Sequence, residues 1–107
     1  MIPKINLQDK MLEITEPFQQ VDVAVVNDQV IRMALITGEY HWHKHHEEDE
    51  LFYVLSGELT IRTVDEDITL SEGEMVVIPR GVEHCPKSDN GCYILMFEPQ
   101  GLKSEGD

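Results

Sequence analysis

Short apolar runs recur along the 107 residues of the chain, and glycine or small polar residues separate them. The runs are rich in Val, Ile, Tyr, Phe and Thr, which favour β-strands, whereas the breaks carry the Gly, Asn, Asp and Ser that tight turns use. This spacing is typical of an all-β sandwich or barrel. We expect strands at Val21–Val26, Val30–Thr37, Tyr40–His45, Leu51–Leu55, Leu59–Val64, Ile68–Leu70, Met75–Ile78 and Cys92–Phe97.

Helical periodicity is nearly absent from the chain. No stretch of it is long enough for a core helix, and we expect only a short turn of helix at Leu7–Leu12. The chain contains no repeat and no linker, so residues 1–107 are expected to form one domain with a core at about 20–98 and a short N-terminal extension. The polar C-terminal tail from Gln100 to Asp107 is expected to fray.

The chain is strongly acidic, with 21 Asp and Glu against 8 Lys and Arg and a net charge of −13. Phosphate backbones and anionic lipids would be repelled by this charge, so we expect no nucleic-acid partner and no membrane partner. The longest apolar runs hold only a few residues, and the first residues do not have the pattern of a signal peptide. We therefore expect a cytoplasmic protein in which Cys85 and Cys92 are free thiols.

A segment rich in histidine and acid, Tyr40–Glu50, carries the first candidate chemistry. Residues two apart on a strand face the same side, so His43 and His45 would project together and could hold one metal ion. Glu50 opens an apolar strand, where an inward carboxylate is costly unless a positive charge neutralises it. Taken alone, the segment is equally compatible with a solvated loop whose charges protect the next strand from aggregation.

A second segment, Gly73–His84, has the pattern of a strand between two turns that ends in a histidine. Pro79 stops the pairing of the strand, and Gly81 permits a sharp reversal that can aim His84 inward. A lone histidine in such a place is more often a surface residue. The second segment gains its weight from its combination with the first.

Together the two segments resemble the two sequence motifs of the cupin family. The first motif is matched by Gly38, His43, His45, Glu50 and Gly57, with Gly38 one residue closer to His43 than is usual. The second motif is matched by Gly73, Pro79, Gly81 and His84, with Ser88 where the family has asparagine. The wider sequence is similar to the short single-domain cupins that are grouped with mannose-6-phosphate isomerase.

This resemblance implies an antiparallel jelly-roll β-barrel, the cupin-type double-stranded β-helix, with one divalent transition metal ion inside. It implies that the ligands are His43, His45, Glu50 and His84, a set that suits Mn, Fe, Co, Ni, Cu or Zn. Four protein ligands on a six-coordinate ion leave two positions for a small substrate or dioxygen. The resemblance also implies a homodimer, the commonest form of oligomer.

Residues that contact a substrate are suggested by their chemistry and position. His41 shares the face of the two candidate ligands on its segment and is expected at the mouth of the barrel, whereas His46 is out of phase and solvated. Tyr40 is expected to point away from the ligands and to serve packing. Arg32 and Arg62 are candidates to clamp a substrate carboxylate or phosphate.

Two functions fit these residues. The first is a metalloenzyme that acts on a small polar molecule with oxygenase or isomerase chemistry, and the presence of all four ligands favours it. The second is a non-catalytic protein that binds a sugar or an organic acid, or that senses metal. The lack of an obvious additional acid or base near the motifs favours the second, and the sequence leaves both open.

Overall fold

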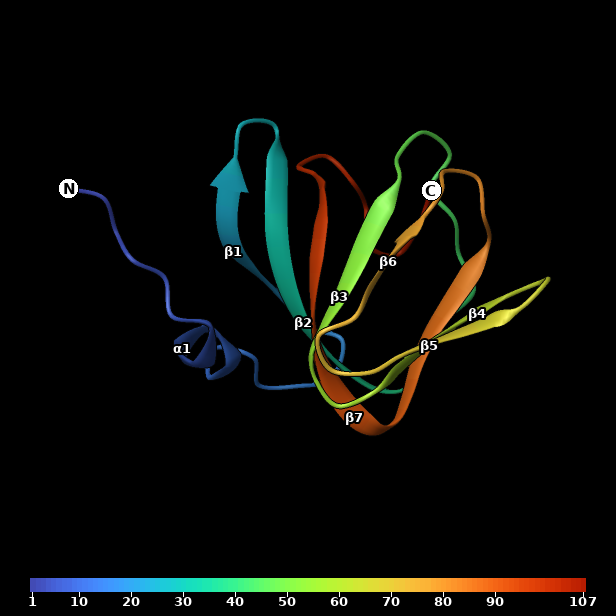
Figure 1. Ribbon diagram of the computed structural model, residues 1–107. Coiled ribbons are helices and arrows are strands. Elements are labelled where there is room, and N and C mark those ends of the chain that lie inside the picture. Colours follow the sequence, from blue (N-terminus) through green and yellow to red (C-terminus); the bar gives the residue numbers. More distant parts are fainter.

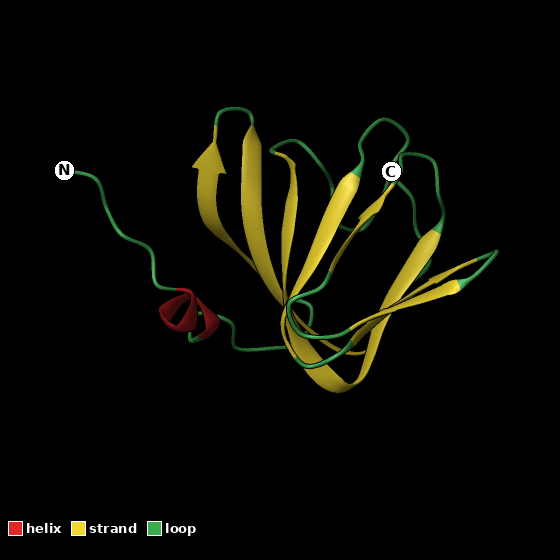
Figure 2. Cartoon of the chain, in the orientation of Figure 1, coloured by secondary structure: helices red, strands yellow, loops and turns green.

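The computed structural model describes all 107 residues and shows a barrel-like arrangement of seven strands with one short helix (Figures 1 and 2). The predicted all-β fold is confirmed. No helix has the length and apolar character needed to cross a membrane. In chain order the elements are α1 Leu7–Met11, β1 Gln20–Val26, β2 Gln29–Glu39, β3 Glu50–Ser56, β4 Leu59–Thr63, β5 Asp67–Leu70, β6 Met75–Ile78 and β7 His84–Pro99.

The long strand β7 connects the two parts of the barrel. Its second half lies between β2 and β3 in the antiparallel order β1-β2-β7-β3-β6, and its first residues pair with β4 of the β4–β5 hairpin. Figure 1 shows this hairpin set at an angle to the other strands. The prediction of Cys92–Phe97 was too short, because Asp89–Gly91 forms part of the strand instead of a turn. Gly91 has φ +88°, and such a distortion within a strand uses the same residue types as a turn.

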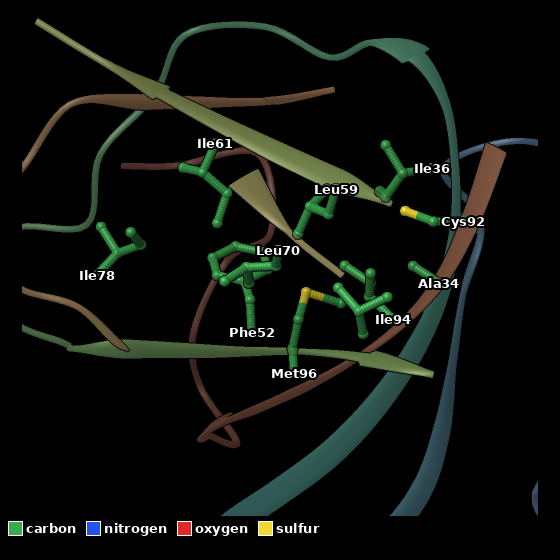
Figure 3. Close-up of a cluster of buried hydrophobic side chains, with 11 residues drawn as sticks. Ala34, Ile36, Phe52, Leu59, Ile61, Leu70, Ile78, Cys92, Ile94 and Met96 are labelled. Carbon is green, nitrogen blue, oxygen red and sulfur yellow. The ribbon is translucent and has the colours of Figure 1, made fainter. Parts of the chain in front are cut away.

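Alternate residues of the strands point into the barrel and form its apolar core (Figure 3). Burial of this surface from water, at about 25 cal/mol per Å², is the main favourable term in folding. Towards one end of the barrel the inward rows become polar, since Glu50 lies two residues before Phe52 on β3 and Glu98 lies two residues after Met96 on β7. The buried cluster contains Ala34, Ile36, Phe52, Val54, Leu59, Ile61, Leu70, Ile78, Cys92, Ile94 and Met96.

The outer face of the β1-β2-β7-β3 sheet carries a second apolar cluster, centred on Ile14, Val23 and Met33. Two side chains of α1, Leu7 and Met11, pack against it and cover part of the face. The alternation of the strands therefore separates a closed core on one side from a partly covered apolar surface on the other.

The predicted strand Tyr40–His45 is wrong. The chain leaves the sheet after Glu39 and runs as a loop to β3. It contacts β7 where the backbone N–H of Tyr40 donates to the carbonyl of Pro86 at 3.0 Å, and where His43 and His84 exchange backbone hydrogen bonds of 3.0 and 2.9 Å. The regular pairing of β2 with β7 has already shifted between Ile36 and Gly38. This irregularity redirects the chain, so that side-chain parity no longer decides which residues face inward.

Candidate metal centre

The four predicted ligands meet at one end of the barrel. His43 and His45 come from the loop between β2 and β3, Glu50 begins β3 and His84 begins β7. One nitrogen or oxygen atom from each side chain lies within 4.8 Å of those of the other three. Glu50 Oε1 is 3.3 Å from His45 Nε2 and 3.6 Å from His84 Nε2.

Backbone contacts between the two motif segments bring these side chains together. The turn after β6 is fixed by Gly81, whose N–H donates to the carbonyl of His45 at 2.7 Å. In the same turn the backbone N–H of Arg80 donates to the Asp49 carboxylate at 2.8 Å. Because Asp49 precedes Glu50, this bond holds the start of β3 against the turn that leads to His84.

Two of the three histidines are oriented by backbone carbonyls. His43 Nδ1 is 2.9 Å from the carbonyl of His41, and His84 Nδ1 is 2.9 Å from the carbonyl of Val82. A carbonyl can only accept, so each Nδ1 carries the proton and each Nε2 offers its lone pair to the site. Histidines that bind a metal are commonly held in this way.

The donor set fits a divalent transition metal ion. His45 Nε2, Glu50 Oε1 and His84 Nε2 are buried and have no hydrogen-bond partner within the protein. A buried polar atom without a partner costs about 1–3 kcal/mol, and a cation shared by all of them would remove that cost. Imidazole nitrogens and a carboxylate oxygen are ligands that first-row transition metals accept. The cluster could therefore hold a metal ion.

The charge of Glu50 is favoured by its neighbours. Burial alone would raise the pKa of this carboxyl, but the close approach of His45, His84 and Glu98 to it outweighs burial and lowers the pKa below its usual range. Burial lowers the pKa of His43 and so favours the neutral ring that a metal needs. Burial acts in the same direction on His45, but the contact with Glu50 outweighs it and raises the pKa.

A second buried carboxyl, Glu98, lies beside Glu50 and was not singled out from the sequence. It is completely buried, and Arg32 Nη1 donates to its Oε1 at 2.8 Å. Burial, and then the neighbouring Glu50, raise the pKa of Glu98 to about 9, although Arg32 acts in the opposite direction. The signal in the sequence was parity on β7, because Glu98 continues the inward row of Ile94 and Met96.

Arg32, one of the residues predicted to bind substrate, forms hydrogen bonds with other groups of the protein. Besides Glu98, its guanidinium donates to the carbonyls of Leu102 at 3.1 Å and Gln100 at 3.0 Å, and to the Asp22 carboxylate at 3.2 Å. In these contacts the N–H donors of the guanidinium group are already engaged with acceptors of the protein. A role of Arg32 in binding substrate stays a prediction that this geometry does not favour.

The other two predicted substrate residues lie outside the cluster of ligands. Arg62 pairs with Glu39 at 3.1 Å, and its guanidinium carbon lies 5.4 Å from the centre of the Trp42 ring. His41 Nε2 is 2.9 Å from the carbonyl of Glu105. Neither residue lines the cavity that adjoins the centre, so their substrate contacts also stay predictions.

A narrow cavity adjoins the candidate ligands. It leaves only about 20 Å³ for the centres of water molecules, which is room for about one or two waters. Tyr40, predicted to pack away from the site, is part of the wall, because the loop conformation of its segment removes the parity argument. The lining residues are Phe18, Gln20, Ala34, Ile36, Tyr40, His43, Glu50, Phe52, Pro86, Ile94, Met96 and Ser104.

The fold and the histidine–glutamate cluster define a small β-barrel protein with one candidate metal centre. The chain belongs to the cupin family, since the family described as "Cupin domain" matches residues 31–97, which include all four candidate ligands. A cupin-2 domain containing protein from Shewanella frigidimarina NCIMB 400 has a similar crystal structure, with a TM-score of 0.87 and 40% sequence identity. That similarity covers 90% of this chain and 94% of the other.

Two curated relatives extend the comparison. The uncharacterized protein YdbB of Bacillus subtilis (strain 168) is 42% identical over 77 residues, covering 71% of this chain and 68% of its own length. A 3-hydroxyanthranilate 3,4-dioxygenase from Xenopus laevis is 27% identical over 114 residues. The match includes 100% of this chain but only 40% of the dioxygenase.

Proposed function

We propose that the protein is a metal-dependent oxygenase for a small polar molecule, with His43, His45, Glu50 and His84 as the metal ligands. The observation that carries this proposal is the convergence of three imidazoles and one carboxylate, three of whose atoms are buried without a partner. The similarity to a dioxygenase supports oxygenase over isomerase chemistry. It also disfavours a purely non-catalytic binding role, and a place in the mannose-6-phosphate isomerase-like group stays an expectation.

A divalent ion bound here would supply a Lewis acid with two open positions, which a small substrate or dioxygen could occupy. The protein's own groups prepare that chemistry. Glu50 contributes the negative charge, and the carbonyls of His41 and Val82 fix the tautomers of His43 and His84. Phe52, Ile94 and Met96 line the cavity with apolar surface, which excludes water from the reacting groups.

Tyr40 is the hydroxyl-bearing aromatic residue of the cavity wall. Its ring meets that of His43 edge-on, with 5.5 Å between the ring centroids. Burial, followed by the charges of Glu105 and Glu50, raises the pKa of its phenol, so Tyr40 keeps its proton near neutral pH. It is therefore suited to donate a hydrogen bond to a bound substrate.

The experiment begins with elemental analysis of protein purified without a histidine tag. Protein loaded with Fe²⁺ or Mn²⁺ is then tested for dioxygen uptake with small catechols, aminophenols, including 3-hydroxyanthranilate, and enediols. Uptake that depends on both metal and substrate, and that is lost in His84→Ala, would support the proposal. Stoichiometric metal with no turnover of any compound would contradict the oxygenase proposal and would favour the non-catalytic binding function.

We also propose that the protein is a cytoplasmic homodimer. The two cysteines are buried free thiols, as expected for a reducing compartment. The apolar outer face of the sheet, which α1 covers only in part, offers a surface on which a second copy could pair.

A further inference from the structure

The segment 100–107, expected to fray, instead folds back over the barrel. Arg32 anchors it by donating to the carbonyls of Gln100 and Leu102. The side chain of Leu102 is buried, with a relative exposure of 5%. Arg32, about seventy residues earlier in the chain, therefore fixes the position of the segment on the barrel.

Beyond Leu102 the chain lies against the candidate metal centre. Ser104 lines the same cavity as His43 and Glu50. Gly106 is packed so closely on the loop that a Cβ atom there would lie 2.7 Å from His43 Cβ and 3.1 Å from the carbonyl of Lys44. Only glycine fits at this position between the carbonyl of Lys44 and the side chain of His43, so the segment packs tightly against the loop that carries the ligands.

Asp107 ends this path beside the third histidine. Its backbone N–H donates to the carbonyl of Lys44 at 3.1 Å, and its carboxylate accepts the backbone N–H of His46 at 2.6 Å. The carboxylates of Asp107 and Glu48 each have an oxygen within 4.8 Å of a ring nitrogen of His45. Two acidic side chains thus approach the same ring from outside the four-ligand cluster.

His45 differs from the other two histidines in one respect. His43 and His84 each place Nδ1 on a backbone carbonyl, whereas the Nδ1 of His45 is buried and has no partner. The Nε2 of His45 faces Glu50 at 3.3 Å, which leaves Nδ1 for the outer carboxylates. The group that holds a metal-binding ring is most often a carboxylate or a carbonyl.

We propose that residues 102–107 form a wall of the metal centre and that Asp107 and Glu48 accept the Nδ1–H of His45, which holds its Nε2 on the ion. This inference rests on the metal site proposed above. It makes Asp107 and Glu48 positioning residues, because they act on the ion through His45. It also assigns the segment to the centre, although it lies outside the two cupin motifs.

The first test measures the affinity for Zn²⁺ by competition with a chelating dye, together with the visible absorption bands of the Co²⁺ form. Asp107→Ala and Glu48→Ala should each weaken Zn²⁺ binding by about 10-fold, the usual loss when the outer partner of a ligand is removed. Asp107→Asn keeps an oxygen acceptor and should lose less. Glu47→Ala and Asp65→Ala remove the same charge from exposed positions and should bind like the wild type.

The second test displaces the segment without removing an acid. Gly106→Ala places its Cβ against His43 and should weaken Zn²⁺ binding and shift the Co²⁺ bands, as Asp107→Ala does. Gly73→Ala is the matched control, since Gly73 shares the positive φ of Gly106 (+85° against +94°) but a Cβ there meets nothing within 4 Å. Circular dichroism and melting of the metal-free variants establish that each is folded.

The outcomes separate the two proposals. A wild-type protein that binds no metal would refute the proposed function. If the wild type binds one ion per chain, and the Glu48, Asp107 and Gly106 variants have the same Zn²⁺ affinity and Co²⁺ spectra as the wild type, only the role of the segment is refuted. Two ions per chain in the wild type and one in Asp107→Ala would mean that His45, Glu48 and Asp107 form a separate cation site, which also overturns the positioning role.

Discussion

Single residues decide which histidine rings meet the metal ion. His43→Ala, His45→Ala and His84→Ala each remove one metal bond and should weaken metal binding by more than the roughly 10- to 100-fold that the loss of an outer partner costs. Glu50→Gln keeps the shape but removes the negative charge, so it should weaken binding as well. His46→Ala is the control, because His46 is exposed and outside the cluster. Metal analysis in which His46→Ala empties the site and His45→Ala does not would show that the assigned ligand is wrong by one residue.

The pH dependence of metal retention follows from the same rings, because a histidine must be neutral to bind a metal ion. Glu50 raises the pKa of His45 despite burial. As the pH falls, this ring is therefore protonated at a higher pH than an ordinary histidine, whose pKa is about 6.5. We expect full occupancy in alkaline buffer and progressive loss from about neutrality downwards. Dialysis against buffers of graded pH, followed by elemental analysis, measures this. A metal content that stays flat from neutral to strongly acid buffer contradicts histidine ligation.

Arg32 contributes to stability through acceptors that cannot reach water. Arg32→Met would leave Glu98 Oε1 and the carbonyl of Leu102 without their donor. An unsatisfied buried group costs about 1–3 kcal/mol, so we expect a loss of about 3 kcal/mol in the free energy of unfolding of the metal-free protein in urea. Arg62→Met breaks an exposed ion pair with Glu39 and should cost less than about 1 kcal/mol. Equal losses in the two variants would contradict this role of Arg32.

At the scale of secondary structure, the sequence predicted the strands whose hydrogen bonds follow simple alternation. The predicted strand Met75–Ile78 has the same bounds as β6. The predicted first strand begins one residue later than β1, and the predicted Leu51–Leu55 is one residue shorter than β3 at each end. The motif spacing also brought together the four residues that meet in the structure, although Tyr40–His45 is a loop. The spacing of the motif residues reflects the complete connection between two strands. The ligand set was therefore predicted although Tyr40–His45 was wrongly predicted as a strand.

What the sequence did not predict depends on contacts between distant residues. Asp89–Gly91 has turn composition but lies within β7, because strands on both sides supply its pairing partners. The segment 100–107 has no apolar pattern, and its order depends on Arg32 and on the loop at His43. Glu98 is buried beside Glu50 by the pairing of β3 with β7. No local pattern predicts the first two features. For Glu98, the alternation along β7 indicates burial but does not reveal the neighbouring Glu50.

Turn glycines give a prediction at the same scale. Gly57 and Gly73 both have positive φ, +87° and +85°, yet their surroundings differ. A Cβ at Gly57 would lie 2.5 Å from the carbonyl oxygen of Gly91, whereas at Gly73 it would meet nothing. Gly73→Ala should cost about 1 kcal/mol from backbone strain, and Gly57→Ala about 1–3 kcal/mol more from the clash. Urea unfolding of the two variants compares them, and equal losses would mean that the contact between Gly57 and Gly91 relaxes freely.

For the whole molecule, the exposed apolar side chains of the outer face predict how two copies pair. Strands β6 and β7 flank β3, and they carry Met75 and Val77 on β6 and Phe97 on β7, which are 58%, 50% and 38% exposed. A patch of this kind on one sheet face is a common site of association. Sedimentation equilibrium should therefore give twice the chain mass of 12.3 kDa.

The charge of the molecule sets the conditions under which this dimer forms. Each copy carries a net charge of −13, so two copies repel each other at low ionic strength, and salt screens that repulsion. We expect the dissociation constant to fall as salt rises from about 0.01 M to 0.15 M. Val77→Glu should give a monomer that still binds metal, whereas Val64→Glu, at an 83% exposed position on the β4–β5 turn, should stay dimeric. A wild-type mass of 12.3 kDa at micromolar concentration and 0.15 M salt would refute the dimer, and dissociation of both variants would place the interface elsewhere.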